Sequence, residues 1–261
     1  MKTTREILEA IKQGNLSIEQ GEEALRKLSL TAVGQIGMLD LNREERSGIP
    51  EVVLAESKSR ENLTQIVYKI VEQKEFVLLT RVSQDKLVHL RDELKDYAYD
   101  VRGEGNHLTV LVHKDGWKEP PKSGKIAIIT AGTSDIVFAE EAVAISRVMG
   151  VEAFTFYDIG VAGIHRLIEP VRKMIEEHID AVVVFAGMEG ALPTVLASLI
   201  EIPVIGVPVP VGYGYGGNGE TALASMLQSC APGLAVVNIG NGLGGGSIAC
   251  LIAKNAAKNS K

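Results

Sequence analysis

The feature that most constrains the fold is a regular alternation of short apolar runs with longer helical stretches in the second half of the chain. The apolar runs cover residues 125–131, 151–157, 181–186, 203–207 and 234–239. Such β-branched, nearly continuous runs are typical of parallel strands that are covered on both faces. The stretches between and after them cover 138–149, 164–177, 191–199, 221–229 and 247–257. We therefore predict an α/β domain: a doubly wound, five-stranded parallel sheet with helices on both faces.

A short stretch rich in Pro, Gly and Lys, residues 116–124, separates this region from the first half of the chain. The first half begins with helical periodicity, and an amphipathic stretch follows at 61–72. Strand-like runs occur at 51–54, 76–80 and 108–112. The pattern predicts a smaller α+β domain over residues 1–120, followed by the α/β catalytic domain over residues 121–261.

Composition restricts the classes of partner. The chain has 27 basic and 33 acidic residues, a net charge of -6, and no basic block, so we expect neither nucleic acid nor a membrane surface as a partner. No signal-peptide core or membrane-length apolar run is present, which favours a cytoplasmic location. Cys230 and Cys250 lack the spacing of a zinc site, and we expect both to be reduced thiols.

In a doubly wound sheet, ligands bind beyond the carboxyl ends of the strands, so the segments that follow the strands are the candidate site. The first such segment contains Gly132, Thr133, Ser134 and Asp135. Small residues and hydroxyls that lead into a helix can bind an anion through backbone N–H groups. A simple helix N-cap explains the same residues equally well.

The third segment places Glu189 between glycines, directly after Gly187 and Met188. A carboxylate in this position would be partly desolvated and suited to general-base work, a reading we favour over a helix-terminal charge. His165, after the second strand, could move protons near neutral pH. A lone histidine is more often structural, so position alone does not assign it a role.

Two later segments are rich in glycine. Residues 212–219, which include Asn218, could approach a ligand closely, form a mobile lid, or be a plain flexible loop. Residues 240–246 contain G-x-G, but the chain has no further strand with the acidic residue that a dinucleotide-binding fingerprint requires. We therefore reject that fingerprint and expect the glycines to allow close packing against a neighbour or a ligand.

The two cysteines differ in context. Cys230 follows the predicted helix 221–229, whose carboxyl end carries partial negative charge and works against thiolate formation. On the residues alone, a buried small hydrophobe is the more common role for such a cysteine. Cys250 lies in a continuous apolar stretch of the last helix, and we assign it to the core.

Read together, the segments after the strands resemble the PurE-type aminoimidazole ribonucleotide carboxylases. The resemblance rests on Gly-Thr-Ser-Asp at 132–135, Ala-Gly-Ile-His-Arg at 162–166, Ala-Leu-Pro at 191–193, and the runs 204–209 and 233–240. Three departures, Gly-Met-Glu-Gly at 187–190, the glycine-tyrosine loop and Cys230, resemble the LarB family of nickel-pincer cofactor biosynthesis. Residues 43–53 and 79–82 are similar to that family's N-terminal signature, although Ser57 stands where we expect a glycine.

The LarB resemblance implies carboxylation of the pyridinium ring of nicotinic acid adenine dinucleotide by CO₂ or bicarbonate. Hydrolysis of the phosphoanhydride would give pyridinium-3,5-biscarboxylic acid mononucleotide and AMP. Cys230 matches the family nucleophile, Glu189 is the candidate base, and His165 matches the catalytic histidine of the PurE-type relatives. The residues assigned to substrate binding are Gly132, Thr133, Ser134, Asp135, Gly187, Met188 and Asn218.

The resemblance also bears on phosphates, metal and assembly. By charge, Arg43, Arg46 or Arg81 could contact the substrate phosphates. Mg²⁺ could assist phosphoanhydride cleavage, although the sequence contains no recognisable cluster of metal ligands, and we assign none. Family members suggest a homo-octamer built on the α/β domains.

Two alternatives remain. A PurE-like carboxylase or mutase acting on an imidazole ribonucleotide would leave Cys230 idle. A nucleotide-sensing domain would bind its ligand through the glycine loops without consuming bicarbonate.

Overall fold

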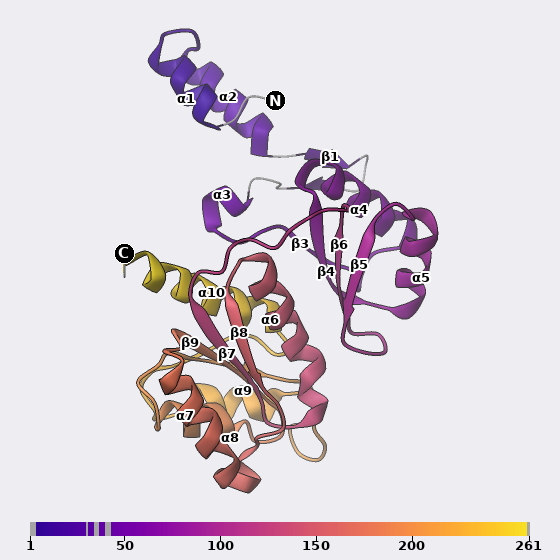
Figure 1. Cartoon of the computed structure of the whole chain (residues 1–261). Helices are drawn as coiled ribbons and strands as arrows, with labels where there is room; N and C mark the ends of the chain where they lie inside the picture. The colour runs from indigo at the N-terminus through magenta and orange to yellow at the C-terminus, as the bar shows by residue number, and fades with distance from the viewer. Residues whose placement is uncertain (1–3, 30, 34–36, 40–42, 260–261) are drawn as a thin grey trace.

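The computed structural model describes residues 4–29, 31–33, 37–39 and 43–259. Two larger sheets organise the chain, one in each half, and they lie one above the other in Figure 1. The five-stranded sheet of the second half has the order β11-β10-β9-β7-β8, and all of its strand pairs are parallel. The predicted fold class is confirmed.

The strands of this sheet follow the predicted apolar runs closely. They are β7 (Lys125–Thr130), β8 (Glu152–Phe156), β9 (Ala181–Ala186), β10 (Val204–Pro208) and β11 (Leu234–Val236). Every residue of β9 and β10 is buried, because both strands lie inside the sheet with helices on both faces. This burial explains why their sequences are apolar without alternation.

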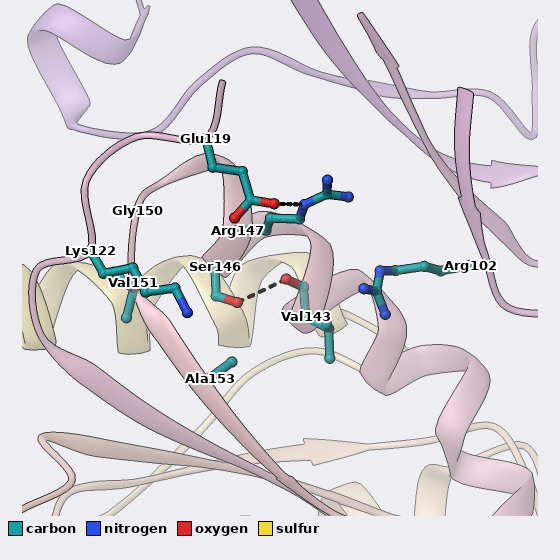
Figure 2. Close-up of a pocket in the computed structure, with 9 residues that line it drawn as sticks. All are labelled: Arg102, Glu119, Lys122, Val143, Ser146, Arg147, Gly150, Val151 and Ala153. Atoms are coloured by element: carbon teal, nitrogen blue, oxygen red, sulfur yellow. Dashed lines mark hydrogen bonds and ion pairs between the residues drawn. The ribbon is translucent and has the colours of Figure 1, made fainter. Parts of the chain in front are cut away.

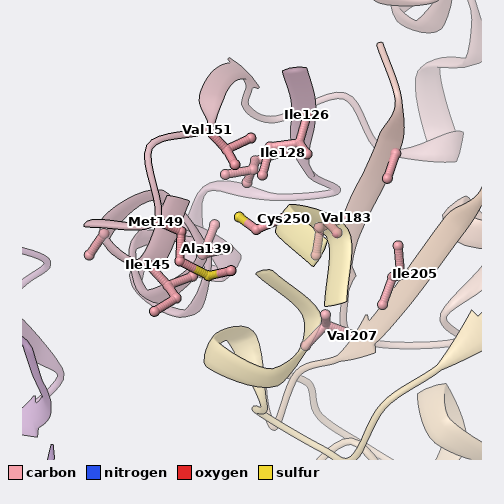
Figure 3. Packing of buried hydrophobic residues seen from close by; sticks show 14 of the residues in the cluster. Ile126, Ile128, Ala139, Ile145, Met149, Val151, Val183, Ile205, Val207 and Cys250 are labelled. Carbon is pink, nitrogen blue, oxygen red and sulfur yellow. The ribbon is translucent and has the colours of Figure 1, made fainter. Parts of the chain in front are cut away.

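Helices cover the two faces of the parallel sheet and form two cores. One face packs against α6 (Ile136–Val148) and α10 (Gly242–Asn259). The other face packs against α7 (Ile168–Glu176), α8 (Ala191–Ala197) and α9 (Glu220–Leu227). Figure 3 shows Cys250 in the first core, near Ile126, Ile145 and Val183. Its side chain is fully buried, so its assignment to the core is confirmed.

The first half is α+β, as predicted. Its helices are α1 (Thr4–Lys12), α2 (Ile18–Ser29), α3 (Arg43–Ser47), α4 (Arg60–Lys74) and α5 (Gln84–Glu93). Its strands are β1 (Thr31–Val33), β2 (Gly37–Leu39), β3 (Val52–Leu54), β4 (Phe76–Val82), β5 (Ala98–Arg102) and β6 (Leu108–His113). The order β3-β4-β6-β5 is mixed: β3 and β4 are parallel, and the other pairs are antiparallel.

Helix α6 packs against strands of both halves of the chain, and it lies between the two sheets in Figure 1. Helices α4 and α5 pack against one face of the mixed sheet. On the other face, Leu78 and Leu111 belong to the core that contains α6. Polar contacts follow the same junction. Arg102 pairs with Glu140 at 3.1 Å, and Arg147 pairs with Asp100 at 2.8 Å.

Arg81 makes the deepest of these polar contacts. It lies at an irregularity of β4 with a left-handed backbone, φ 53°. Its guanidinium donates to the Gly240 carbonyl at 2.9 Å and lies 3.6 Å from the Glu141 carboxylate, which is 6% exposed. Burial raises the pKa of Glu141, whereas the Leu243 N–H and Arg81 act in the opposite direction. Arg81 therefore ties the first half to the start of α10.

The glycine-rich segment 240–246 lies mostly within a helix. Helix α10 begins at Gly242, five residues before its predicted start, and Glu141 accepts the Leu243 N–H at 3.0 Å. A Cβ on Gly246 would lie 2.7 Å from the Cα of Ala142 in α6. The expected close packing against a neighbour is confirmed, and the neighbour is the protein's own core.

A second difference concerns the predicted helix 164–177. Its start is a 3₁₀ segment, η2 (Val161–Leu167), and the α-helix begins only at Ile168. Gly163 has non-helical backbone angles, which interrupts the segment. Separately, no helix within the described part of the chain is long and apolar enough to cross a membrane.

Candidate functional site

A cavity of about 490 Å³ opens at the carboxyl ends of the parallel strands. Segments that follow β7, β8, β9 and β10 build its wall, as the topology of a doubly wound sheet requires. The lining residues are Ala131, Gly132, Ser134, Asp135, Gly160, Val161, Ala162, Ala186, Gly187, Met188, Glu189, Ala191, Leu192, Val211, Gly212 and Tyr213. Six of the predicted site residues therefore meet in one cavity: Gly132, Ser134, Asp135, Gly187, Met188 and Glu189.

Asp135 is the buried acid of this cavity. It belongs to the 3₁₀ turn η1 (Thr133–Asp135) that starts α6, and it is 4% exposed. Its Oδ2 accepts the Gly132 N–H at 2.8 Å, which closes the turn. Burial raises the pKa of Asp135 to about 6, and the nearby charge of Asp158 adds to this effect. A carboxyl with that pKa can exchange protons near neutral pH.

The segment after β9 bends sharply at the cavity. Met188 and Gly190 have left-handed backbones, with φ of 50° and 63°, and the Gly190 N–H donates to the Gly187 carbonyl at 2.9 Å. A Cβ on Gly190 would lie 2.8 Å from the backbone of Ala222 in α9, so only glycine fits. Glu189 between them is exposed in the single chain. The partial desolvation that we expected for Glu189 is therefore absent here.

The glycine loop after β10 forms the rim. Val211 accepts the Met188 N–H at 3.3 Å, which ties the loop to the preceding segment. A smaller cavity of about 180 Å³ shares Met188, Glu189, Val211, Gly212 and Tyr213 with the larger one. Asn218 has a left-handed backbone and an exposed side chain, and it lines neither cavity.

The charge of the wall limits what the large cavity can bind. Among the described residues that line it, Asp135 and Glu189 are acidic and none is Lys, Arg or His. Val161, Ala162, Leu192 and Val211 supply apolar surface. Such a wall suits a planar group that is neutral or cationic better than a phosphate.

The sequence analysis missed these apolar residues. The signal was available, because Val161 and Val211 follow strands just as the predicted polar residues do.

Other predicted site residues lie apart from the cavity. Thr133 and His165 are exposed and do not line it. Arg43 and Arg46 are exposed on α3, near the middle of α10, and Arg43 lies 3.7 Å from Glu51. Within one chain, these two arginines do not reach the cavity.

Cys230 is exposed, unlike Cys250, and it also lies apart from the cavity. Helix α9 starts at the carboxyl end of β10 and leads back toward the amino end of β11. The Val204 N–H, at the amino end of β10, donates to the Gly233 carbonyl, three residues after Cys230. The thiol therefore follows a helix that leads away from the cavity in its own chain.

A further cavity, of about 430 Å³, lies between the linker and α6 (Figure 2). Its cations are compensated by carboxylates. Arg147 pairs with Glu119 and Asp100, Arg102 with Glu140, and Lys122 lies 3.8 Å from Glu152. These pairs join the linker and both halves, and each of these cations already has a carboxylate partner. We take the cavity at the carboxyl ends as the candidate site, because it gathers six of the predicted site residues.

Within residues 4–29, 31–33, 37–39 and 43–259, no group of three or more His, Cys, Asp or Glu side chains could hold a metal ion.

Comparisons with known proteins find a different family model in each half of the chain. The family model described as LarB/PurE-like N-terminal domain matches residues 31–107, and the AIR carboxylase model matches residues 125–261. An uncharacterized protein from Methanocaldococcus jannaschii is 42% identical over 256 residues, which is 97% of this chain and 98% of the relative.

N5-carboxyaminoimidazole ribonucleotide mutases are also similar over part of the chain. The enzyme from Methanocaldococcus jannaschii is 36% identical over 44% of this chain and 68% of its own length. The enzyme from Pyrococcus abyssi is 34% identical over 44% of this chain and 64% of its own length.

Proposed function

Because the chain belongs to the LarB/PurE-like carboxylase family, we propose that it carboxylates the pyridinium ring of nicotinic acid adenine dinucleotide. The products are pyridinium-3,5-biscarboxylic acid mononucleotide and AMP. The observation that carries this proposal is the wall of the large cavity, which has two carboxylates, apolar surface and no cationic side chain among its described residues. A pyridinium ring is planar and positively charged, so its chemistry matches that wall.

The reaction needs a nucleophile because an electron-poor pyridinium does not attack CO₂. Addition of the Cys230 thiolate at ring C4 forms a C–S bond and gives a neutral dihydropyridine whose C5 is enamine-like. C5 then forms a C–C bond with CO₂. A base removes the C5 proton, the C–S bond breaks, and the thiolate leaves as aromaticity returns. Water cleaves the phosphoanhydride in a separate step.

The cavity offers two carboxylates for the proton transfer. Glu189, on the bend after β9, is the proposed base. Asp135 is the second candidate, because burial raises its pKa to about 6. Ser134 and the backbone around Gly132 and Gly187 then position the substrate. Met188 contacts the ring, and His165 stays outside this set unless a second copy brings it closer.

The position of Cys230 supports the proposal that a second copy of the chain completes the site. Helix α9 spans about 12 Å, and it carries Cys230 away from the cavity of its own chain. An apolar stripe on η2 and α7 supports assembly: Ile164, Ile168 and Ile175 are exposed by 60%, 71% and 59%. We propose that the chain forms a homo-octamer in which Cys230 of one copy reaches the cavity of another.

The phosphates and the metal follow from the same proposal. No cationic side chain among the described residues lines the cavity, so Arg43 and Arg46 of a neighbouring copy are the proposed phosphate ligands. The described residues form no ligand cluster for Mg²⁺, and we assign no step of the reaction to it. If Mg²⁺ binds, the substrate diphosphate would supply its ligands.

The proposed function is tested by incubating the protein with nicotinic acid adenine dinucleotide and ¹³C-bicarbonate, followed by mass spectrometry. We expect a mononucleotide that carries one additional labelled carboxylate, together with AMP. Conversion of an imidazole ribonucleotide instead would establish the PurE-like alternative. Ligand binding without any label uptake would establish the nucleotide-sensing alternative.

The shared site is tested by mixing two inactive variants. Cys230→Ser lacks the nucleophile, and Glu189→Gln lacks the proposed base. We expect mixed oligomers, formed by joint refolding, to recover up to about a quarter of wild-type carboxylation, because some sites then receive both native residues. Mixed oligomers that stay inactive would show that both residues serve the site from the same chain.

A further inference from the structure

Two tyrosines on the glycine loop are unusually exposed. Tyr213 is 81% exposed and Tyr215 is 100% exposed. Aromatic rings normally bury most of their surface, so a ring held in water at the rim of a cavity suggests a contact that forms when a ligand arrives. Tyr213 lines both the large cavity and the smaller one beside it, whereas Tyr215 lines only the smaller one. Of these two rings, only Tyr213 lines the proposed substrate site.

The backbone beside Tyr213 permits its ring to move. Gly212 precedes it and Gly214 follows it. Gly214 has φ 73°, and no atom lies within 4 Å of the position that a Cβ would take there. The base of the loop is held more firmly, because the Met188 N–H donates to Val211. The ring can thus swing over the cavity while the loop stays attached.

The cavity wall beside the tyrosine suits a flat group. Met188 is 45% exposed, and its sulfur lies 3.5 Å from the position that a Cβ on Gly212 would take. Val161, Ala162 and Leu192 add apolar surface. Asp135 and Glu189 supply negative charge, and no described lining residue supplies positive charge. A planar cation that lies against this wall, with the tyrosine ring over its exposed face, would satisfy each of these groups.

We propose that Tyr213 is a specificity-determining residue whose ring face covers the quaternary pyridinium of the substrate. The site thereby selects a cationic, fully aromatic ring over the neutral dihydropyridine of the same shape. This inference rests on the proposed function, since it assigns the pyridinium to this cavity. It adds a residue and a selectivity that the carboxylation chemistry alone does not require.

The electrostatics give the selection its direction. The negative face of the tyrosine ring attracts the positive charge of a pyridinium, and this attraction vanishes when the ring gains a hydride and becomes neutral. Asp135 and Glu189 act in the same direction. We expect the cationic form to bind about tenfold more tightly than the neutral form.

The test uses two probes of nearly equal size, 1-methylnicotinamide, which is cationic, and 1-methyl-1,4-dihydronicotinamide, which is neutral. Calorimetry would measure the binding of each to the full chain, to Tyr213→Ala, to Tyr213→Phe and to Tyr68→Ala. Tyr68 is a matched control, because it is a half-exposed tyrosine on α4 in the other half of the chain.

We expect wild type, Tyr213→Phe and Tyr68→Ala to prefer the cation, because phenylalanine retains the ring face. Tyr213→Ala should lose most of the preference, with about a tenfold weaker affinity for the cation and little change for the neutral probe. A preference that survives in Tyr213→Ala, or that is absent from wild type, would overturn the proposal. Circular dichroism checks that the exposed loop change leaves the fold intact.

The outcome is separable from that of the proposed function. The probes carry no phosphate and need no bicarbonate, so their binding is measured without turnover. If wild type carboxylates nicotinic acid adenine dinucleotide and Tyr213→Ala shows an unchanged KM, the role of Tyr213 fails while the activity stands. If carboxylation fails but the cation preference depends on Tyr213, the role of Tyr213 stands and the proposed activity fails.

Discussion

Residues 212–219 and 240–246 each contain five glycines, yet the structure uses them in opposite ways. The first segment is mostly exposed, forms the rim of the cavity and carries Tyr213 in water. The second starts α10 and packs directly against α6 and the parallel sheet. The comparison shows that glycine content alone does not indicate a ligand loop. In the first segment Gly214 has open space around it, although Gly216 and Gly219 pack closely against their neighbours. In the second segment the missing side chains of Gly242, Gly245 and Gly246 let α10 approach α6 and the sheet.

The largest expected effect comes from filling the buried segment. Gly246→Val places a branched side chain within 2.7 Å of Ala142 and 2.8 Å of Ile145, so we expect a loss of about 3 kcal/mol or more of stability. Gly214→Ala is the control, because its site is open and only its left-handed backbone disfavours alanine, at about 1 kcal/mol. Urea unfolding measures both. Equal losses of stability in the two variants would contradict the different roles that we assign to the two glycine-rich segments.

A smaller loss of stability is expected at the contact between the first half of the chain and segment 240–246, which Arg81 makes. Arg81→Ala removes the counter-ion of buried Glu141 and a hydrogen bond to the Gly240 carbonyl. We expect the free energy of unfolding to fall by about 2 kcal/mol. This is less than for a fully buried pair, because Arg81 is partly exposed. Adding Glu141→Gln should recover part of this loss, since it removes the unpaired charge. A double variant whose losses simply add would show that the two side chains are not coupled.

On the cavity side, the expected effect is a pH dependence of stability. Burial raises the pKa of Asp135 from its ordinary 3.8 to about 6, so the folded state holds this proton more tightly than the unfolded state. The protonated Asp135 carboxyl contributes its whole stabilisation below about pH 4, and this stabilisation is lost as the pH rises through about 6.

Asp135→Asn removes that loss while an amide oxygen can still accept the Gly132 N–H. Relative to wild type, the variant should gain about 1–3 kcal/mol between pH 4 and pH 7. Urea unfolding at several pH values measures the difference. A difference that stays constant across this range would show that the carboxyl does not titrate as its burial indicates.

The sequence predicted the sheet well because burial on both faces imposes apolar runs such as 181–186, and these are visible without any tertiary information. Ser134 and Asp135 lie at the carboxyl edge of the sheet, as expected, since topology alone sends them there. The apolar wall was not predicted, because apolar residues near strand ends resemble core residues in a sequence.

Other parts of the account depend on packing that a sequence does not display. The helical start of α10 required knowing that α6 lies against Gly246. The exposure of Glu189 and the direction in which α9 carries Cys230 required the three-dimensional arrangement of the helices. Residues of a second copy, which we propose at this site, leave no periodic pattern in the chain.

The central claim is that Cys230 is the nucleophile of a carboxylation, and the two cysteines allow a direct test. The measurement is the uptake of ¹³C-bicarbonate into nicotinic acid adenine dinucleotide by Cys230→Ser and Cys250→Ser, side by side. Cys250 is fully buried and its pKa is raised to about 12 by that burial, so its variant should remain active with a modest loss of stability. Cys230→Ser should keep its fold and oligomer but lose carboxylation by at least about a thousandfold, because a serine hydroxyl is scarcely ionised at neutral pH. Substantial carboxylation by Cys230→Ser would contradict covalent catalysis by this residue.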